Sequence, residues 1–190
     1  MRVFAIKRLS EEEYNEHSSV EEDDGSMKLN LGCGRDYKEG WINVDKYDSG
    51  DIVWNLNVTP YPFPDDSAES ILLDNVLEHI ESAHSLLEEC YRILKPGGTC
   101  RIIVPYYNSA GAYNDITHVH FFNHTSIKQL FEGESRGVHQ NNTDFSILIK
   151  DKCGFVGRLI PFTGLRHQVA QIIGNTILEL DIEAIKEVRA

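Results

Sequence analysis

The chain has 190 residues, of which 41% are hydrophobic and 25% are charged, and this composition favours one globular domain with a sizeable core. Its formal net charge of −12 disfavours a general nucleic-acid partner, because an acidic surface repels phosphate backbones. No apolar run approaches the ~18 residues that span a bilayer, and no apolar stretch follows the basic residues at the N-terminus, so we expect a cytoplasmic protein that does not associate with membranes.

An N-terminal arm and acidic linker are expected over residues 1–26, ahead of a single domain over residues 27–190. Residues 10–26 are rich in Glu, Asp and Ser, and a like-charged run of this kind repels itself and usually stays solvated. A dedicated binding role for this segment is the alternative. The cysteines form no C-x-x-C pair, which indicates reduced thiols rather than a disulfide framework.

Strand patterns and helix patterns alternate from Met27 onward. Short apolar stretches bounded by turn residues predict strands at 27–31, 41–45, 51–55 and 70–73. Apolar residues at steps of three and four from Leu77 to Leu94 predict an amphipathic helix, which Pro96-Gly97-Gly98 should end. Beyond it we predict a strand at 99–104, a loop at 105–123, a helix from about Thr125, a strand at 144–149, a helix at 165–173 and a strand at 178–184.

This order of elements predicts an α/β fold of the doubly wound, Rossmann-like type, with a mostly parallel sheet. Residues 178–184 alternate apolar and charged side chains, a pattern that is typical of a half-exposed strand. We therefore expect this C-terminal strand to form an antiparallel edge of the sheet.

The strongest functional signal is the turn Gly32-Cys33-Gly34, which follows the first predicted strand. Its glycines let the backbone turn sharply and approach a ligand, and Asp45, ending the second strand, can accept hydrogen bonds from the ribose hydroxyls of an adenosine. A dinucleotide fingerprint needs a third glycine where Tyr37 stands and an acid farther along the chain than Asp45, so a pyrophosphate is disfavoured. An adenosine ligand without phosphates fits this pattern, and a tight turn without a ligand is the alternative.

Five stretches in this order resemble the class I S-adenosylmethionine-dependent methyltransferases. They read LNLGCG, GWINVD, PFPD, VLEHI and LKPGG, at Leu29–Gly34, Gly40–Asp45, Pro62–Asp65, Val76–Ile80 and Leu94–Gly98. The resemblance covers residues 28–131 and implies S-adenosylmethionine as the cofactor. The chain departs from the family pattern at Asn30, Asp36, Asn55 and Asn75, where an acid, a glycine, an acid and a histidine are common.

The resemblance also implies a set of cofactor contacts at the carboxyl ends of the predicted strands. Leu31, Gly32, Cys33 and Gly34 would line the methionine moiety, and Asp45 would hold the ribose with Lys46 beside it. Asn55 and Leu56 would contact the adenine. Asp74 and Asn75 would border the region of the reacting methyl group. Glu78-His79 begins the predicted helix and is interpreted mainly as structural, with Glu78 at the positive end of the helix dipole.

A second group of polar side chains follows the fifth predicted strand, at residues 115–124. We predict His118 as a general base oriented by Asp115, because imidazole titrates near neutrality. In an extended segment His120 would point the same way as His118. The acceptor pocket would be lined by Tyr106, Tyr107 and His120. Packing of these side chains without a catalytic role is the alternative.

The predicted function is methyl transfer from S-adenosylmethionine to a small-molecule acceptor, and family association alone favours an acceptor related to saccharides. The sequence predicts neither the identity of that acceptor nor the oligomeric state. Two alternatives stay open. One is a catalytically inactive module that binds an adenosyl ligand or a protein partner. The other is a metal-dependent enzyme that uses Asp115 with His118, His120 and His124.

Overall fold

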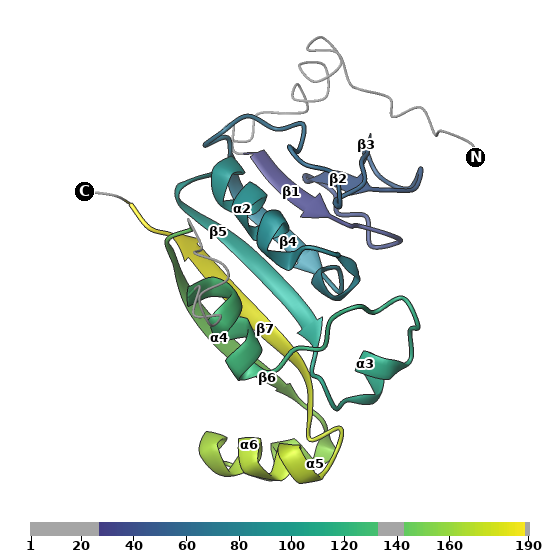
Figure 1. Ribbon diagram of the computed structural model, residues 1–190, viewed down its shortest axis with the longest axis vertical. Coiled ribbons are helices and arrows are strands. Elements are labelled where there is room, and N and C mark those ends of the chain that lie inside the picture. Colours follow the sequence, from purple (N-terminus) through teal and green to yellow (C-terminus); the bar gives the residue numbers. More distant parts are fainter. Residues whose placement is uncertain (1–26, 133–142, 189–190) are drawn as a thin grey trace.

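The computed structural model describes residues 27–132 and 143–188, so the expected arm and linker over residues 1–26 lie outside the described residues. Within the described part, the strands form one seven-stranded sheet in the order β3-β2-β1-β4-β5-β7-β6 (Figure 1). The first five strands pair in parallel. They are β1 (Met27–Leu31), β2 (Ile42–Asp45), β3 (Ile52–Val53), β4 (Ala68–Asp74) and β5 (Leu94–Pro105).

An antiparallel pair completes the sheet and confirms the predicted antiparallel edge. The C-terminal strand β7 (Ile177–Lys186) runs antiparallel to β5, as the alternating sequence predicted. It is not the outermost strand, because β6 (Phe145–Cys153) pairs with its other side. Along β6 every second side chain is exposed, which is the burial pattern of an edge strand with one face toward the core.

The direction of winding fixes where a ligand can bind. The chain builds β1, β2 and β3 in one direction across the sheet, and then returns to lay β4 and β5 on the other side of β1. A crevice forms beyond the carboxyl ends of the strands where the order reverses, which here is between β1 and β4. The doubly wound, mostly parallel fold expected from the sequence is therefore confirmed.

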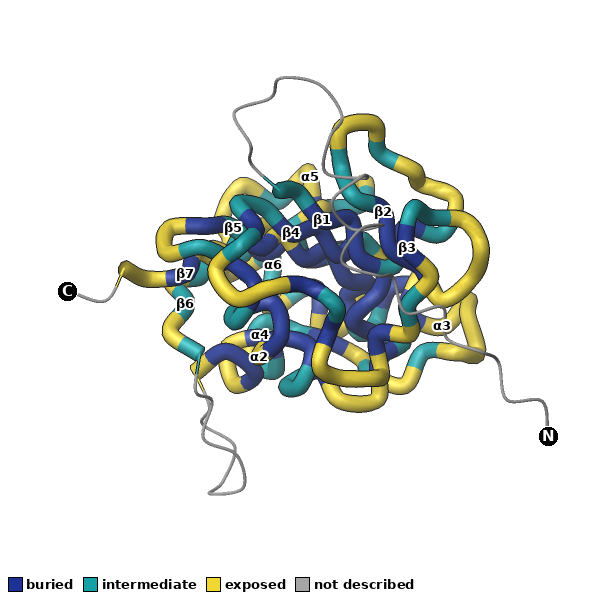
Figure 2. The backbone as a smooth tube through the Cα atoms, turned by 90° about the horizontal axis from the view of Figure 1, so that it is seen from above, coloured by how far each residue is buried: buried dark blue, intermediate teal, exposed yellow. Residues whose placement is uncertain are grey.

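Two helices, α2 (Ala83–Ile93) and α4 (His124–Glu132), cover the same face of the sheet (Figure 1 and Figure 2). Ser82 caps α2 by accepting a hydrogen bond from the backbone N–H of Ser85 at 3.3 Å. Asn123 and Ser126 cap α4 reciprocally, with side-chain to backbone hydrogen bonds of 2.8 and 2.9 Å. The core that these helices form with the sheet includes the fully buried Leu29, Leu31, Ile71, Leu73, Leu86, Ile93, Ile102 and Ile127.

The predicted helix from Leu77 to Leu94 is shorter in the structure. Residues Leu77–His79 form a separate 3₁₀ turn, η1, and Ile80 is extended. The helix α2 begins after this break and ends at Ile93, so that β5 already starts at Leu94 and Pro96-Gly97-Gly98 lies within its span. The apolar spacing misled the prediction because η1 also buries Leu77, at the spacing that a continuous helix would have.

The other face of the C-terminal half of the sheet carries paired charges. Arg101 forms an ion pair with Asp181 at 2.7 Å, and Lys152 forms one with Glu179 at 2.8 Å. Ion pairs at the surface contribute little to stability, and their charges keep this face of the sheet hydrated. Two short helices, α5 (Phe155–Arg158) and α6 (Thr163–Ile172), lie beyond the ends of β6 and β7.

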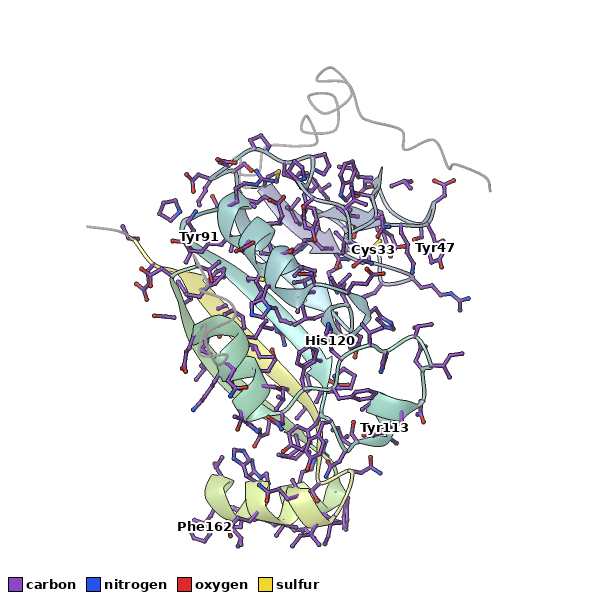
Figure 3. The ribbon with its side chains drawn as sticks, viewed as in Figure 1. Cys33, Tyr47, Tyr91, Tyr113, His120 and Phe162 are labelled. Carbon is purple, nitrogen blue, oxygen red and sulfur yellow. The ribbon has the colours of Figure 1, made fainter. Side chains whose placement is uncertain are left out.

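The loop after β5 carries the remaining short helix, α3 (Ala110–Tyr113). Figure 3 shows Tyr113 on this loop, beyond the carboxyl end of β5. Of the helices within residues 27–132 and 143–188, none has the length and hydropathy of a membrane span.

Candidate active site

The turn Gly32-Cys33-Gly34 has the backbone conformation that its glycines allow. Gly32 has a φ of +72° and Gly34 a φ of +52°, values that residues with a Cβ atom rarely adopt. The N–H groups of Gly32 and Cys33 both donate to the carbonyl oxygen of Val44 in β2, at 2.7 and 3.0 Å. A Cβ atom on Gly32 would lie 2.5 Å from a methyl group of Val76, so the loops after β1 and β4 meet here.

Asp45 lies at the end of β2 and holds the glycine turn in place. One carboxylate oxygen accepts the N–H of Gly34 at 2.9 Å, and the other accepts the N–H of Tyr47 at 2.9 Å. The residue is 7% exposed. Because an ionised carboxylate has about four lone-pair positions, Asp45 can accept further hydrogen bonds from ligand hydroxyls while it holds the turn.

Asn30, where relatives often have an acid, has a structural role. Its side-chain N–H donates to the Asn43 side chain at 2.9 Å and to the backbone carbonyl of Asp36 at 2.8 Å. Asn43 in turn donates to Asp51. These buried amides tie the connection between β1 and β2 to the strands. The departures at Asn30 and Asp36 therefore belong to one hydrogen-bonded network beside the turn.

The other expected cofactor contacts lie at the carboxyl ends of β2, β3 and β4. Lys46 is exposed with its ammonium 5.1 Å from the ring centre of Tyr47, and Figure 3 shows Cys33 and Tyr47 at this edge of the sheet. Asn55 is exposed, whereas Leu56 is buried in the core. Asp74 accepts a hydrogen bond from the side chain of Asn75, whose φ is +53°.

His118 comes from the loop after β5 and lies against η1. Its Nδ1 is 2.9 Å from the carbonyl oxygen of Ala112, and its Nε2 is 4.0 Å from a carboxylate oxygen of Glu78. A carbonyl oxygen only accepts, so Nδ1 carries the proton and Nε2 of the neutral ring holds the lone pair. This is the tautomer that a general base acting through Nε2 needs.

Asp115 has a different place from the one predicted. Its carboxylate accepts hydrogen bonds from the N–H and the hydroxyl of Thr117, at 2.8 and 2.7 Å. These bonds from Thr117 are the main reason why the pKa of Asp115 lies below its usual value. The Thr117 hydroxyl also lies 2.9 Å from Nδ1 of His79. The carbonyl of Ala112, rather than Asp115, therefore orients the ring of His118.

Glu78 is the site residue that the sequence interpretation missed. Its side chain is 1% exposed, and its carboxylate oxygens have no hydrogen-bond partner among the described residues. Burial raises its pKa to about 7. Glu78 does lie in the first turn of η1, as that interpretation has it, but its side chain is buried there rather than solvated. A signal was present, because Glu78 interrupts the apolar residues Val76, Leu77 and Ile80.

The backbone joins Glu78 to the second polar group. The carbonyl oxygen of Glu78 accepts the N–H groups of Val119 and His120, at 2.8 and 3.2 Å. The ring of His79 packs edge-on against that of His118, with 4.6 Å between centroids. Burial, followed by the nearby His118, lowers the pKa of His79. The two motifs, 40 residues apart in the sequence, thus form one cluster of Glu78, His79, Thr117 and His118.

The remaining predicted residues are dispersed. The ring of His120 is directed at the carbonyl oxygen of Glu81, with its Nε2 at 3.3 Å, whereas the ring of His118 contacts the carbonyl of Ala112. His124 begins α4 and contacts Asp151 at 2.7 Å. His118, His120 and His124 therefore do not form one ligand set. Tyr106 is buried in the core and stacks edge-on with the partly exposed Tyr107, with 5.0 Å between ring centroids.

Comparison with known proteins finds relatives of the part of the chain that contains the glycine turn and Asp45. Residues 32–102, from the glycine turn to the middle of β5, match the family model described as a methyltransferase domain. This part of the chain is similar to methyltransferase domains. Within the chain, a 50-residue stretch is 44% identical to the ubiquinone/menaquinone biosynthesis C-methyltransferase UbiE of Desulfotalea psychrophila. That stretch is 26% of this chain and spans about a fifth of the relative (20%).

Several solved structures have the same fold as this chain. A SAM-dependent methyltransferase from Archaeoglobus fulgidus has a TM-score of 0.60 and 19% identity, with 85% of this chain and 86% of that one covered. Phosphoethanolamine N-methyltransferase 2 of Haemonchus contortus, in complex with S-adenosyl-L-methionine, has a TM-score of 0.55 and 14% identity. The match covers 86% of this chain and 49% of that one.

Proposed function

We propose that this protein transfers a methyl group from S-adenosylmethionine to a small-molecule nucleophile. The observation that carries the proposal is the glycine turn held against Asp45, within residues 32–102, which match the family model described as a methyltransferase domain. The residues fit the cofactor, because a carboxylate suits ribose hydroxyls and because no atom of the described residues would lie within 4 Å of a Cβ atom on Gly34. The bound cofactor would supply a methyl group activated on a positively charged sulfur.

The residues of this chain would then align the acceptor and receive its proton. The turn at Gly32–Gly34 and the end of β2 would hold the cofactor, and the loop after β5 would hold the acceptor above the same edge of the sheet. His118 Nε2 would take the proton that the acceptor loses when its lone pair bonds to the methyl carbon. The electron pair of the broken carbon–sulfur bond would stay on sulfur.

Cofactor binding is the first prediction and the direct test of the proposal. Isothermal titration of the full chain with S-adenosylmethionine, and separately with S-adenosylhomocysteine, should show saturable binding of one ligand per chain. Each ligand should also raise the melting temperature, because a ligand that binds the folded state alone stabilises it. No heat and no shift with either ligand would refute the proposal.

Asp45→Ala is predicted to weaken cofactor binding by about 1.5–3 kcal/mol, the usual range for a hydrogen bond to a charged group. The expected loss has two sources, the acceptor for the ribose and the hydrogen bond that holds Gly34. Glu88→Ala, on the exposed side of α2, removes the same charge and should leave the dissociation constant unchanged. An unchanged constant in folded Asp45→Ala would mean that another group binds the ribose.

A metal-dependent reaction is the second candidate, and it now rests on a different set of residues. Ligand atoms of Glu78, His79 and His118 lie within 4.8 Å of one another, a spacing that a metal ion can bridge. Glu78, buried without a hydrogen-bond partner among the described residues, favours this reading. Methyl transfer that persists in the presence of a strong chelator would exclude it. Cofactor binding without any turnover would instead support the inactive module.

A further inference from the structure

A second cluster of ligating side chains lies at the far end of the same sheet edge, away from the glycine turn. We call it the His–Asp–His cluster, and it consists of His124 at the start of α4, Asp151 near the end of β6, and His167 in α6. Nε2 of His124 is 2.7 Å from one carboxylate oxygen of Asp151, and Nε2 of His167 is 3.1 Å from the other. None of these side chains contributes to the proposed methyl transfer.

The cluster has the compactness of a ligand set. One ligand atom from each residue falls within 4.8 Å of the other two, and the two imidazole rings lie tilted at 37° with their centroids 3.9 Å apart. The side chain of Asp151 is 5% exposed. Both rings thus direct the same nitrogen toward one buried carboxylate, which is the arrangement that a shared cation would require.

We propose that the His–Asp–His cluster binds one divalent transition-metal ion of the Zn²⁺ type. Imidazole nitrogen and carboxylate oxygen are ligands that Zn²⁺ prefers, at about 2.0–2.2 Å, and three protein ligands leave at least one position for water. The inference goes beyond the proposed function, since it concerns α6 and β6 rather than the cofactor site. On binding, the ion takes the place of the hydrogen between each Nε2 and the carboxylate: a neutral ring moves its one proton to Nδ1, and a charged ring releases its Nε2 proton to water.

A pocket reaches Asp151, the carboxylate of the cluster. It has a volume of about 550 Å³, and Asp151, Cys153 and Arg166 are among its lining residues. Arg166 is the cation that faces the carboxylate, with its Nη1 3.5 Å from Asp151. Its Nε and Nη2 donate to the carbonyls of Gly157 and Ile160 at 3.1 and 2.9 Å, so two backbone groups also hold this guanidinium in place.

The helix α6 packs weakly on the sheet, so a bound ion could stabilise its attachment. Ala170 is the buried residue of this helix, and Phe162, at its start, is 71% exposed (Figure 3). Because little apolar surface holds α6 to the sheet, polar contacts attach it in the described part of the chain: those of His167 and Arg166 with Asp151, and the one from the Asn108 side chain to the carbonyl of Ala170. A bound ion would join α4, β6 and α6 and would stabilise this end of the fold.

The test uses Zn²⁺ and the full chain, with His79→Ala as the background so that the cluster around Glu78 cannot bind the ion. Isothermal titration of His79→Ala should show one Zn²⁺ per chain, and Zn²⁺ should raise its melting temperature until a chelator is added. Adding His167→Ala or Asp151→Asn to this background should weaken binding at least about 10-fold, since even outer partners of a ligand contribute that much. Asp151→Asn keeps the shape of the side chain and serves if His167→Ala does not fold.

Co²⁺ provides a second readout, because visible absorption bands reveal its coordination. Co²⁺ in the His79→Ala protein should give bands that disappear in the Asp151→Asn double variant. Three outcomes overturn the proposal: no saturable binding of Zn²⁺ to His79→Ala, binding that survives both cluster variants unchanged, or binding to the unaltered chain that His79→Ala alone abolishes.

Discussion

His118→Ala should lower kcat for methyl transfer by about 10²–10⁴-fold, the usual contribution of a general base, while the affinity for S-adenosylmethionine stays unchanged. The reason is geometric. Nδ1 of His118 is committed to the carbonyl of Ala112, so Nε2 is the atom left to take a proton from the acceptor. The measurement is steady-state turnover, followed as S-adenosylhomocysteine release with a panel of small nucleophilic acceptors.

Two further measurements distinguish a role of His118 in proton transfer from a role in shaping the acceptor pocket. External imidazole should restore part of the activity of His118→Ala, which it would not do if the ring only packed against His79. Asp115→Ala should have a smaller effect than His118→Ala, because Asp115 acts through Thr117. A fall in kcat below about tenfold in His118→Ala would assign the residue to pocket shape, and it would indicate an acceptor that arrives already ionised.

Most of the fold was predictable because its strands are set by local patterns. Apolar runs between turn residues located β1, β2 and β4 to within a few residues, and the alternation of 178–184 gave β7 its antiparallel direction. The position of β6 outside β7 was not predictable, since alternation shows that one face is exposed but does not say which strand lies beside it. The break before α2 depends on the Ser82 cap, which a periodicity argument overlooks.

In the candidate site too, the features set by local sequence were predictable and those set by long-range contacts were not. The glycine turn and Asp45 were predictable because one short motif and one strand end carry them. The contact between Glu78 and His118 was not, since it requires the loop after β5 to hydrogen-bond to η1. Equal spacing in an extended segment placed His118 and His120 together, yet each ring has its own carbonyl partner, Ala112 or Glu81. Long-range backbone contacts therefore decided which histidine reached the site.

Gly32→Ala should destabilise the fold by about 2–5 kcal/mol, and its expected cost has two separable parts. A left-handed φ costs a non-glycine residue on the order of 1–2 kcal/mol, and a Cβ atom 2.5 Å from Val76 adds overpacking of typically 1–3 kcal/mol. Gly34→Ala is the matched control. Gly34 also has a positive φ, but a Cβ atom added there would meet no atom of the described residues within 4 Å. Gly34→Ala should therefore lose only the cost of the left-handed φ, about 1–2 kcal/mol.

Urea denaturation of the single variants and of the Gly32→Ala/Val76→Ala double variant measures both parts. Val76→Ala alone removes buried methyl groups and destabilises the chain. In the double variant the same truncation removes the clash, so its total loss should be smaller than the sum of the two single losses by about 1 kcal/mol or more. Strict additivity would show that the loops after β1 and β4 do not touch. The glycine turn would then owe its shape to Asp45 and Val44 alone.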